Sequence, residues 1–181
     1  MKKIISLFLG AILLFNNMNA QVNNLKVHPL HLLRSKFEFE RKLSDNVSVG
    51  AIGSVFFLYS GYRIEPYCRL YFMPANTKAA FTGTYLQIKG HYSKAIDKQT
   101  PENEVISEYG FSAALGYQIQ FKNNITMDFF SGYRSSHTLY PSTTEASSMF
   151  SLMYNLPLDL GISIGYAFGS APINNNLNTF H

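Results

Sequence analysis

Residues 150–168 read FSLMYNLPLDLGISIGYAF. Every even-numbered position carries an apolar side chain, whereas the odd positions carry mostly small or polar residues such as Ser151, Asp159 and Gly161. Successive side chains of a β-strand point to opposite faces of the sheet, so this period of two predicts a strand with one apolar face. Residues 155–159 resemble a turn, and a split there would create a ninth strand. The apolar phase does not slip across them, so we predict one long strand.

After Gln21 the same alternation recurs along the chain, and no window there keeps apolar residues at helical spacing for more than two turns. Eight strands with turns between them favour an antiparallel barrel. Pro29 cannot donate to a strand ladder, so we expect it at a bulge or at the start of the first strand. The predicted strands span residues 25–33, 36–43, 47–57, 62–72, 82–93, 107–121, 125–134 and 148–168.

Turn-forming residues separate these strands. Short polar connections are predicted at residues 44–46, 74–76 and 122–124, and two longer ones at residues 94–106 and 135–147. With an even number of strands, both termini lie at the end of the barrel that carries the short turns. The two long connections then share the opposite end, which is the loop asymmetry of outer-membrane barrels.

The composition agrees with two distinct environments. The 181 residues are 46% hydrophobic and 15% aromatic but only 14% charged, and the mean hydropathy is -0.03. This is too apolar for a disordered chain and too polar for several membrane helices. Sorting by strand position separates an apolar face from a sparse, charge-balanced polar face. The polar face includes Glu38, Glu40, Lys42, Arg63, Glu65, Arg69, Gln87, Lys89, His91, Gln118, Asp128, Arg134 and Asp159.

Such a polar face suits the narrow interior of an eight-stranded membrane barrel, which small and paired polar groups just fill. The ion pairs that we expect join Arg63, Glu65 and Arg69 on one strand to Glu38, Glu40 or Asp128 on others. The apolar face places Tyr or Phe near the ends of the runs, as aromatic belts at two membrane interfaces do. The alternative is a soluble barrel whose core buries these aromatic residues.

Residues 1–20 have the pattern of a cleaved signal peptide. Lys2 and Lys3 precede an apolar run of about 12 residues, whereas a membrane span needs about 20. Without these two lysines, the 15 basic residues fall to 13 against 11 acidic ones, a net charge of +2. No basic cluster remains that would bind nucleic acid. We then expect residues 21–168 to form the barrel and residues 169–181 to form a flexible periplasmic tail.

The chain resembles the small eight-stranded outer-membrane barrels of Gram-negative bacteria, the superfamily of the OmpA membrane domain and OmpX. The similarity is carried by residues 26–30 (KVHPL) and 39–43 (FERKL), and by residues 161–168 (GISIGYAF). The last run is similar to the terminal strand signal that the barrel-assembly machinery reads. The resemblance implies an all-β, eight-stranded antiparallel up-and-down transmembrane β-barrel in the outer membrane, with both mature termini in the periplasm.

No motif for catalysis or metal binding stands out. The sequence holds no phosphate loop and no nucleophile elbow, and its histidines lack the spacing of a zinc site. Cys68 falls in the apolar parity of its strand, so we predict a small lipid-facing or core residue and not a catalytic thiol. The histidines are His28, His31, His91, His137 and His181.

One Ser-His-Glu set has to be weighed, because eight-stranded relatives include lipid A-modifying enzymes. It would combine Ser135 or Ser136 with His137 and Glu145 on the last long connection. Consecutive loop residues rarely point at a common reacting atom, so a solvated loop is favoured. We therefore predict no catalytic, cofactor-binding or metal-binding residue.

The expected function is that of a non-enzymatic scaffold or small subunit in the outer membrane. Its expected partners are outer-membrane lipids and lipopolysaccharide, the barrel-assembly machinery during insertion, and a larger outer-membrane complex. The connections at residues 94–106 and 135–147 would make the contacts outside the cell. The alternatives are an outer-membrane lipid A-modifying enzyme and a soluble lipocalin-like carrier whose apolar face turns inward.

Overall fold

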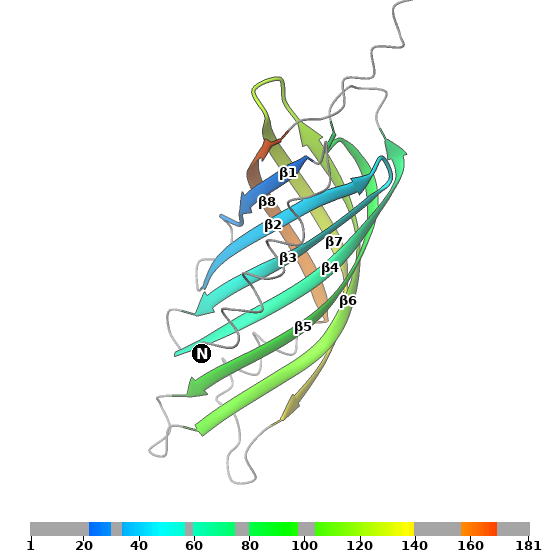
Figure 1. Cartoon of the computed structure of the whole chain (residues 1–181). Helices are drawn as coiled ribbons and strands as arrows, with labels where there is room; N and C mark the ends of the chain where they lie inside the picture. Colours follow the sequence, from blue (N-terminus) through cyan, green and yellow to red (C-terminus); the bar gives the residue numbers. More distant parts are fainter. Residues whose placement is uncertain are drawn as a thin grey trace, which may run out of the picture.

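The computed structural model describes residues 22–29, 34–56, 60–74, 80–97, 104–139 and 157–169. Within them, eight antiparallel strands follow one another in chain order and close into a barrel (Figure 1). This confirms the all-β, eight-stranded antiparallel barrel. The strands are β1 (Asn23–Val27), β2 (Arg34–Ser44), β3 (Val47–Phe56), β4 (Ser60–Pro74), β5 (Gly83–Asp97), β6 (Glu104–Gln120), β7 (Ile125–Leu139) and β8 (Leu158–Phe168).

The first and last strands close the barrel. Leu25 of β1 lies opposite Phe39 of β2 on one side and opposite Tyr166 of β8 on the other. Closure gives every strand two neighbours, so the sheet has no free edge that another chain could extend. The β1–β8 pairs include parts of residues 26–30 and 161–168, two of the three runs on which the resemblance rests.

The two faces of the sheet are inverted relative to a soluble barrel. On β4, Arg63, Glu65 and Arg69 point inward and are almost wholly buried, while Ile64 and Leu70 point outward and are about half exposed. Among the described residues, 28 large hydrophobic side chains are exposed, whereas 23 polar or charged residues are buried. The predicted separation by strand parity is therefore confirmed, with the polar face inside.

One end of the barrel carries the short turns, and we call it the turn side. Asn124 closes the β6–β7 turn with a φ of 63°, a left-handed conformation that Asn tolerates better than most residues. Phe81, which precedes β5, is fully buried there against Val22 and Ala167. Its backbone N–H donates to the side chain of Gln120. The opposite end, where β5 passes to β6 and β7 to β8, is the loop side.

Several predicted strand limits are wrong. The first strand ends at Val27, because Pro29 lies beyond it in a turn and not within the ladder. The connection predicted at residues 94–106 is narrower, since β5 continues to Asp97 and pairs with β6 from Glu104 onward. The predicted loop at residues 135–147 likewise begins too early, because β7 runs to Leu139 and pairs with β6 there.

Other predictions fall outside the described residues. These are the signal peptide at residues 1–20, the turn residues 75–76, the start of the last predicted strand at residues 148–156 and the tail from residue 170 onward. The described part of the last strand begins at Leu158. Just before it, the carbonyl of Pro157 accepts a hydrogen bond from the backbone N–H of Arg134.

Candidate functional sites in the interior and on the outer wall

Five charged residues form a cluster in the turn-side half of the interior, and we call it the turn-side cluster. The Arg69 guanidinium lies 3.1 Å from Glu38, 3.0 Å from Glu40 and 2.9 Å from Asp128. Lys26 Nζ contacts the same carboxylates at 3.0, 2.6 and 3.1 Å. All five side chains are inaccessible to solvent. Two cations thus share three carboxylates, and the predicted pairing of Arg69 is confirmed.

The predicted partners of Arg63 and Glu65 are wrong. Arg63 donates to Glu108 of β6 at 3.1 Å, and Glu65 lies 3.5 Å from Lys36 and 3.6 Å from Lys89. These residues point inward nearer the loop side, beyond reach of the turn-side carboxylates. Parity predicts the face of a side chain, but the depth along the barrel depends on how neighbouring strands are staggered. The same stagger brings Lys89 within 2.8 Å of Asp159.

Glycines allow large polar side chains to cross the interior. The ring of Tyr67 lies over Gly50 of the neighbouring strand, at the place where a Cβ would otherwise stand. Its hydroxyl then reaches Glu38 of β2, two strands away, at 2.6 Å. Tyr85 crosses Gly116 in the same way and donates to Asp128. Gly50 and Gly116 therefore leave space that the phenol rings of Tyr67 and Tyr85 occupy.

Of the Ser-His-Glu set weighed from the sequence, Ser135 and His137 share the outer face of β7, whereas Ser136 does not face His137. Ser136 and His137 are neighbours on β7, so they face opposite sides of the wall: Ser136 points toward His91 inside, and His137 lies against the ring of Tyr109 outside. Glu145 lies outside the described residues. A different trio, His91, Ser136 and Glu108, meets inside the barrel. Gly110 lies between His91 and Ser136 in the register, and because it has no side chain, the other two can touch.

This second trio does not have the geometry of a catalytic triad. Nε2 of His91 lies 3.1 Å from Ser136 Oγ and 3.4 Å from a carboxylate oxygen of Glu108. In a triad, the acid holds the ring nitrogen opposite to the one that contacts the nucleophile. Here both contacts use the same nitrogen, and Glu108 also accepts from Arg63. The arrangement therefore acts as part of the buried polar network.

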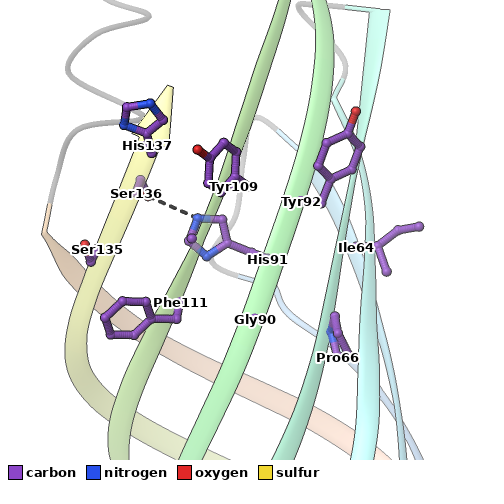
Figure 2. Close-up of a pocket in the computed structure, with 11 residues that line it drawn as sticks. Ile64, Pro66, Gly90, His91, Tyr92, Tyr109, Phe111, Ser135, Ser136 and His137 are labelled. Carbon is purple, nitrogen blue, oxygen red and sulfur yellow. Dashed lines mark hydrogen bonds between the residues drawn. The ribbon is translucent and has the colours of Figure 1, made fainter. Parts of the chain in front are cut away.

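A groove of about 800 Å³ lies on the outer face, across β4 to β7, and we call it the wall groove (Figure 2). Gly90 of β5 lies in its floor, and Ser135 of β7 stands at one side. The inward-pointing His91 and Ser136 contribute to its base. Large side chains surround the floor: Ile64, Pro66, Tyr92, Tyr109, Phe111 and His137.

Sequence reasoning overlooked two kinds of feature. Lys36 has the same parity as Glu38 and Glu40 on one strand, and Lys26 alternates with the apolar Leu25 and Val27, so strand alternation could have assigned both lysines to the interior. No sequence pattern indicates the wall groove, because its residues come from four strands, β4 to β7, and meet only when those strands pair in this register. Cys68 is exposed on the outer face, which agrees with its predicted apolar parity.

The histidines do not form a shared site in the described part of the chain. His28 Nε2 lies 2.7 Å from Glu38, whereas His31 and His181 fall outside the described residues. In the ranges that the structure describes, no group of three or more His, Cys, Asp or Glu residues is placed to hold a metal ion. Within those same ranges, no helix is long and apolar enough to cross a membrane.

Comparison of the chain with protein-family models, with curated proteins and with solved structures gives no match in any of the three.

Proposed function

We propose that this protein is an integral outer-membrane β-barrel of the kind represented by the OmpA membrane domain and OmpX, and that it serves as a non-enzymatic scaffold. One observation carries the proposal: the barrel is apolar outside and charged inside. In water, an apolar surface that surrounds a monomer promotes aggregation. In a bilayer, the same apolar surface contacts the lipid chains. Closure of the barrel also pairs the backbone N–H and C=O groups, which lipid chains cannot hydrogen-bond.

The outward aromatic residues support a membrane of ordinary thickness. Tyr62 and Phe72 are both exposed and stand ten positions apart on β4. A tilted strand crosses the hydrocarbon core in about 9–11 residues. Tyr109 near the loop side and Phe121 at the turn side frame β6 in a similar way. These pairs fit two interfacial belts, with the strands beyond the loop-side belt projecting from the bilayer.

The filled interior supports a scaffold and not a pore. An eight-stranded barrel has an interior that side chains just fill. Here Arg69, Lys26 and their carboxylates occupy it without solvent access. In this proposal the segments that follow Asp97 and Leu139 face outward from the cell, where they contact lipopolysaccharide, surfaces or a larger complex. The barrel-assembly machinery is the partner during insertion.

The test is fractionation of cells that express the full chain. We expect the protein in the outer-membrane fraction, resistant to extraction by urea, with an electrophoretic mobility that changes when the detergent-solubilised sample is boiled. The mobility change reports unfolding of a closed, detergent-resistant barrel. A urea-soluble periplasmic protein without a mobility shift would overturn the proposal.

The two alternatives have less support. A lipocalin-like carrier needs an apolar interior to hold a hydrophobic ligand, whereas this interior buries Arg63, Arg69 and Glu108. A lipid A-modifying enzyme would need a nucleophile with a positioned base, and the Ser136–His91 contact lacks the acid on the opposite ring nitrogen. Unchanged lipid A mass in cells that express wild-type protein and Ser136→Ala would agree with the non-enzymatic proposal.

A further inference from the structure

The wall groove exists because one outward side chain is missing. In the register of the outer face, Gly90 lies opposite Phe111, and Phe111 lies opposite Ser135. The adjacent outward row, toward the loop side, contains Tyr92 opposite Tyr109. Because Gly90 has no side chain, a gap remains on the outer face on the turn side of the two tyrosines. This gap, which we also call the slot, is the centre of the wall groove. The groove volume of about 800 Å³ lies in the range of about 300–1,000 Å³ that is typical of ligand pockets.

The floor of the slot contains an unusual backbone acceptor. β4 and β5 keep one register on both sides of the groove, but their ladder pairing is interrupted where Pro66 faces Gly90. Proline has no N–H group, so Pro66 cannot donate to the carbonyl of Gly90. Because Gly90 has no side chain, nothing of its own covers that carbonyl. In an apolar environment, a carbonyl without a donor costs free energy that a ligand hydroxyl would recover.

The depth of this acceptor indicates which lipid fits. If the loop side faces outward, Tyr92 and Tyr109 lie at the outer membrane interface. Gly90 precedes Tyr92 by two residues on β5 and lies nearer the turn side, and two residues of a tilted strand span a depth of about 5 Å. A donor at that depth has to sit on an acyl chain just below the headgroup. An ordinary phospholipid chain carries no donor there, but a β-hydroxyacyl chain does.

We propose that the wall groove binds one acyl chain of a β-hydroxyacylated glycolipid of the outer leaflet, whose chain hydroxyl donates to the Gly90 carbonyl. This inference rests on the proposed membrane location and orientation. A second copy of the chain fits less well, because its wall N–H groups already pair within their own ladder. The hydroxyl of Ser135 stands at the edge of the slot and offers the glycolipid a second polar contact.

Two glycines provide a matched pair of variants. A Cβ added to Gly90 would meet nothing closer than a backbone oxygen at 4.0 Å, and one added to Gly53 would meet nothing within 4 Å. Both positions face outward, but only Gly90 lies in the groove. Gly90→Leu therefore fills the slot, whereas Gly53→Leu adds the same side chain elsewhere on the wall. Pro66→Ala restores the missing N–H and leaves the slot open.

The experiment is native mass spectrometry of the full mature barrel in detergent micelles. The two probes are a glucosamine phosphate acylated with β-hydroxymyristoyl chains and its counterpart with plain myristoyl chains. For wild-type protein and Gly53→Leu, we expect about fivefold tighter binding of the hydroxylated probe, the ratio that one hydrogen bond supplies. Gly90→Leu should lose binding of both probes. Pro66→Ala should bind both probes but lose the preference.

Three outcomes would overturn this inference alone, provided that the barrel is recovered from membranes. They are equal binding by Gly90→Leu and Gly53→Leu, no preference for the hydroxylated probe in the wild-type protein, and a wild-type dimer that Gly90→Leu converts to a lipid-free monomer. A barrel that remains soluble without detergent would instead overturn the proposed function, and this inference with it.

Discussion

At the scale of single residues, the interior replaces a hydrophobic core with shared charges. Arg69 touches three carboxylates, and Lys26 touches the same three. A buried ion pair contributes little net free energy compared with an apolar substitute, but the loss of one partner leaves buried charges that are strongly unfavourable. The network is therefore sensitive to the removal of a single member.

We expect Arg69→Met to destabilise the barrel by about 3–5 kcal/mol, because Lys26 alone would then face three buried carboxylates. The measurement is urea unfolding in phospholipid vesicles, followed by tyrosine fluorescence or mobility shift. Lys122 is exposed in the β6–β7 turn, so Lys122→Met is a suitable control with a change within about 0.5 kcal/mol. Equal stability of the two variants would contradict the role assigned to Arg69.

The glycine positions differ in kind, which gives a second prediction at this scale. A Cβ at Gly50 would collide with the ring of Tyr67 and the carbonyl of Phe39, whereas one at Gly53 meets open space. We expect Gly50→Ala to lower the free energy of unfolding by about 1–3 kcal/mol, since it displaces Tyr67 from Glu38. Gly53→Ala should be neutral or slightly stabilising. The same unfolding assay compares them, and similar losses would argue against the crossing of Tyr67 over Gly50.

At the scale of elements, the β5–β6 hairpin is longer than its composition indicates. Asp97 and Glu104 belong to residue types that are depleted in strands, so sequence alone predicted a loop from residue 94 onward. In the structure, Lys94 lies opposite Ser107 and Asp97 opposite Glu104. Ladder pairing with an adjacent strand outweighs the weak strand preference of polar residues.

Hydrogen exchange tests this extension. Amides of residues 94–96 and 105–107 that point into the ladder should exchange slowly, because the paired strand protects them. Lys122 and Asn123, in the turn at the other end, provide the exposed reference. Exchange measured by NMR on the barrel in micelles would detect the difference. Fast exchange throughout residues 94–107 would restore the longer loop.

For the whole molecule, the proposed membrane location predicts that the cost of an outward charge depends on its depth in the bilayer. Ile88 lies near the middle of β5 and is exposed, while Leu43 is exposed close to the turn-side end of β2. We expect Ile88→Arg to cost about 2–4 kcal/mol and Leu43→Arg about 0–1 kcal/mol. Unfolding in vesicles measures both. In a water-soluble barrel both substitutions would be nearly neutral, so equal small effects would contradict membrane insertion.

Closure is also a property of the whole molecule. All the other pairs join strands that are consecutive in the chain, but β1 must pair with β8, and this joins residues near opposite ends of the described chain. Such a contact forms late, because a long loop has to close before the pairing is gained. Once formed, it leaves no strand edge exposed.

The class of structure could be predicted from the sequence: all-β, eight strands, and two chemically distinct faces. That much follows from the period of two, which is local and therefore readable from residues such as Ile162, Ser163 and Ile164. It also anticipated that Arg69 would pair with Glu38, Glu40 or Asp128, because inward charges in a narrow barrel need partners.

Which inward charges meet, and where the outer wall is hollow, became visible with the folded barrel. Arg63 reaches Glu108 and not Asp128, and Gly90 opens a groove beside Pro66, because both outcomes depend on the stagger between strands. Alternation along one strand carries no information about that stagger, which is set by pairing across the sheet. The face that each side chain occupies is thus set locally along its own strand, whereas the clusters and the groove depend on how all eight strands pair in the closed barrel.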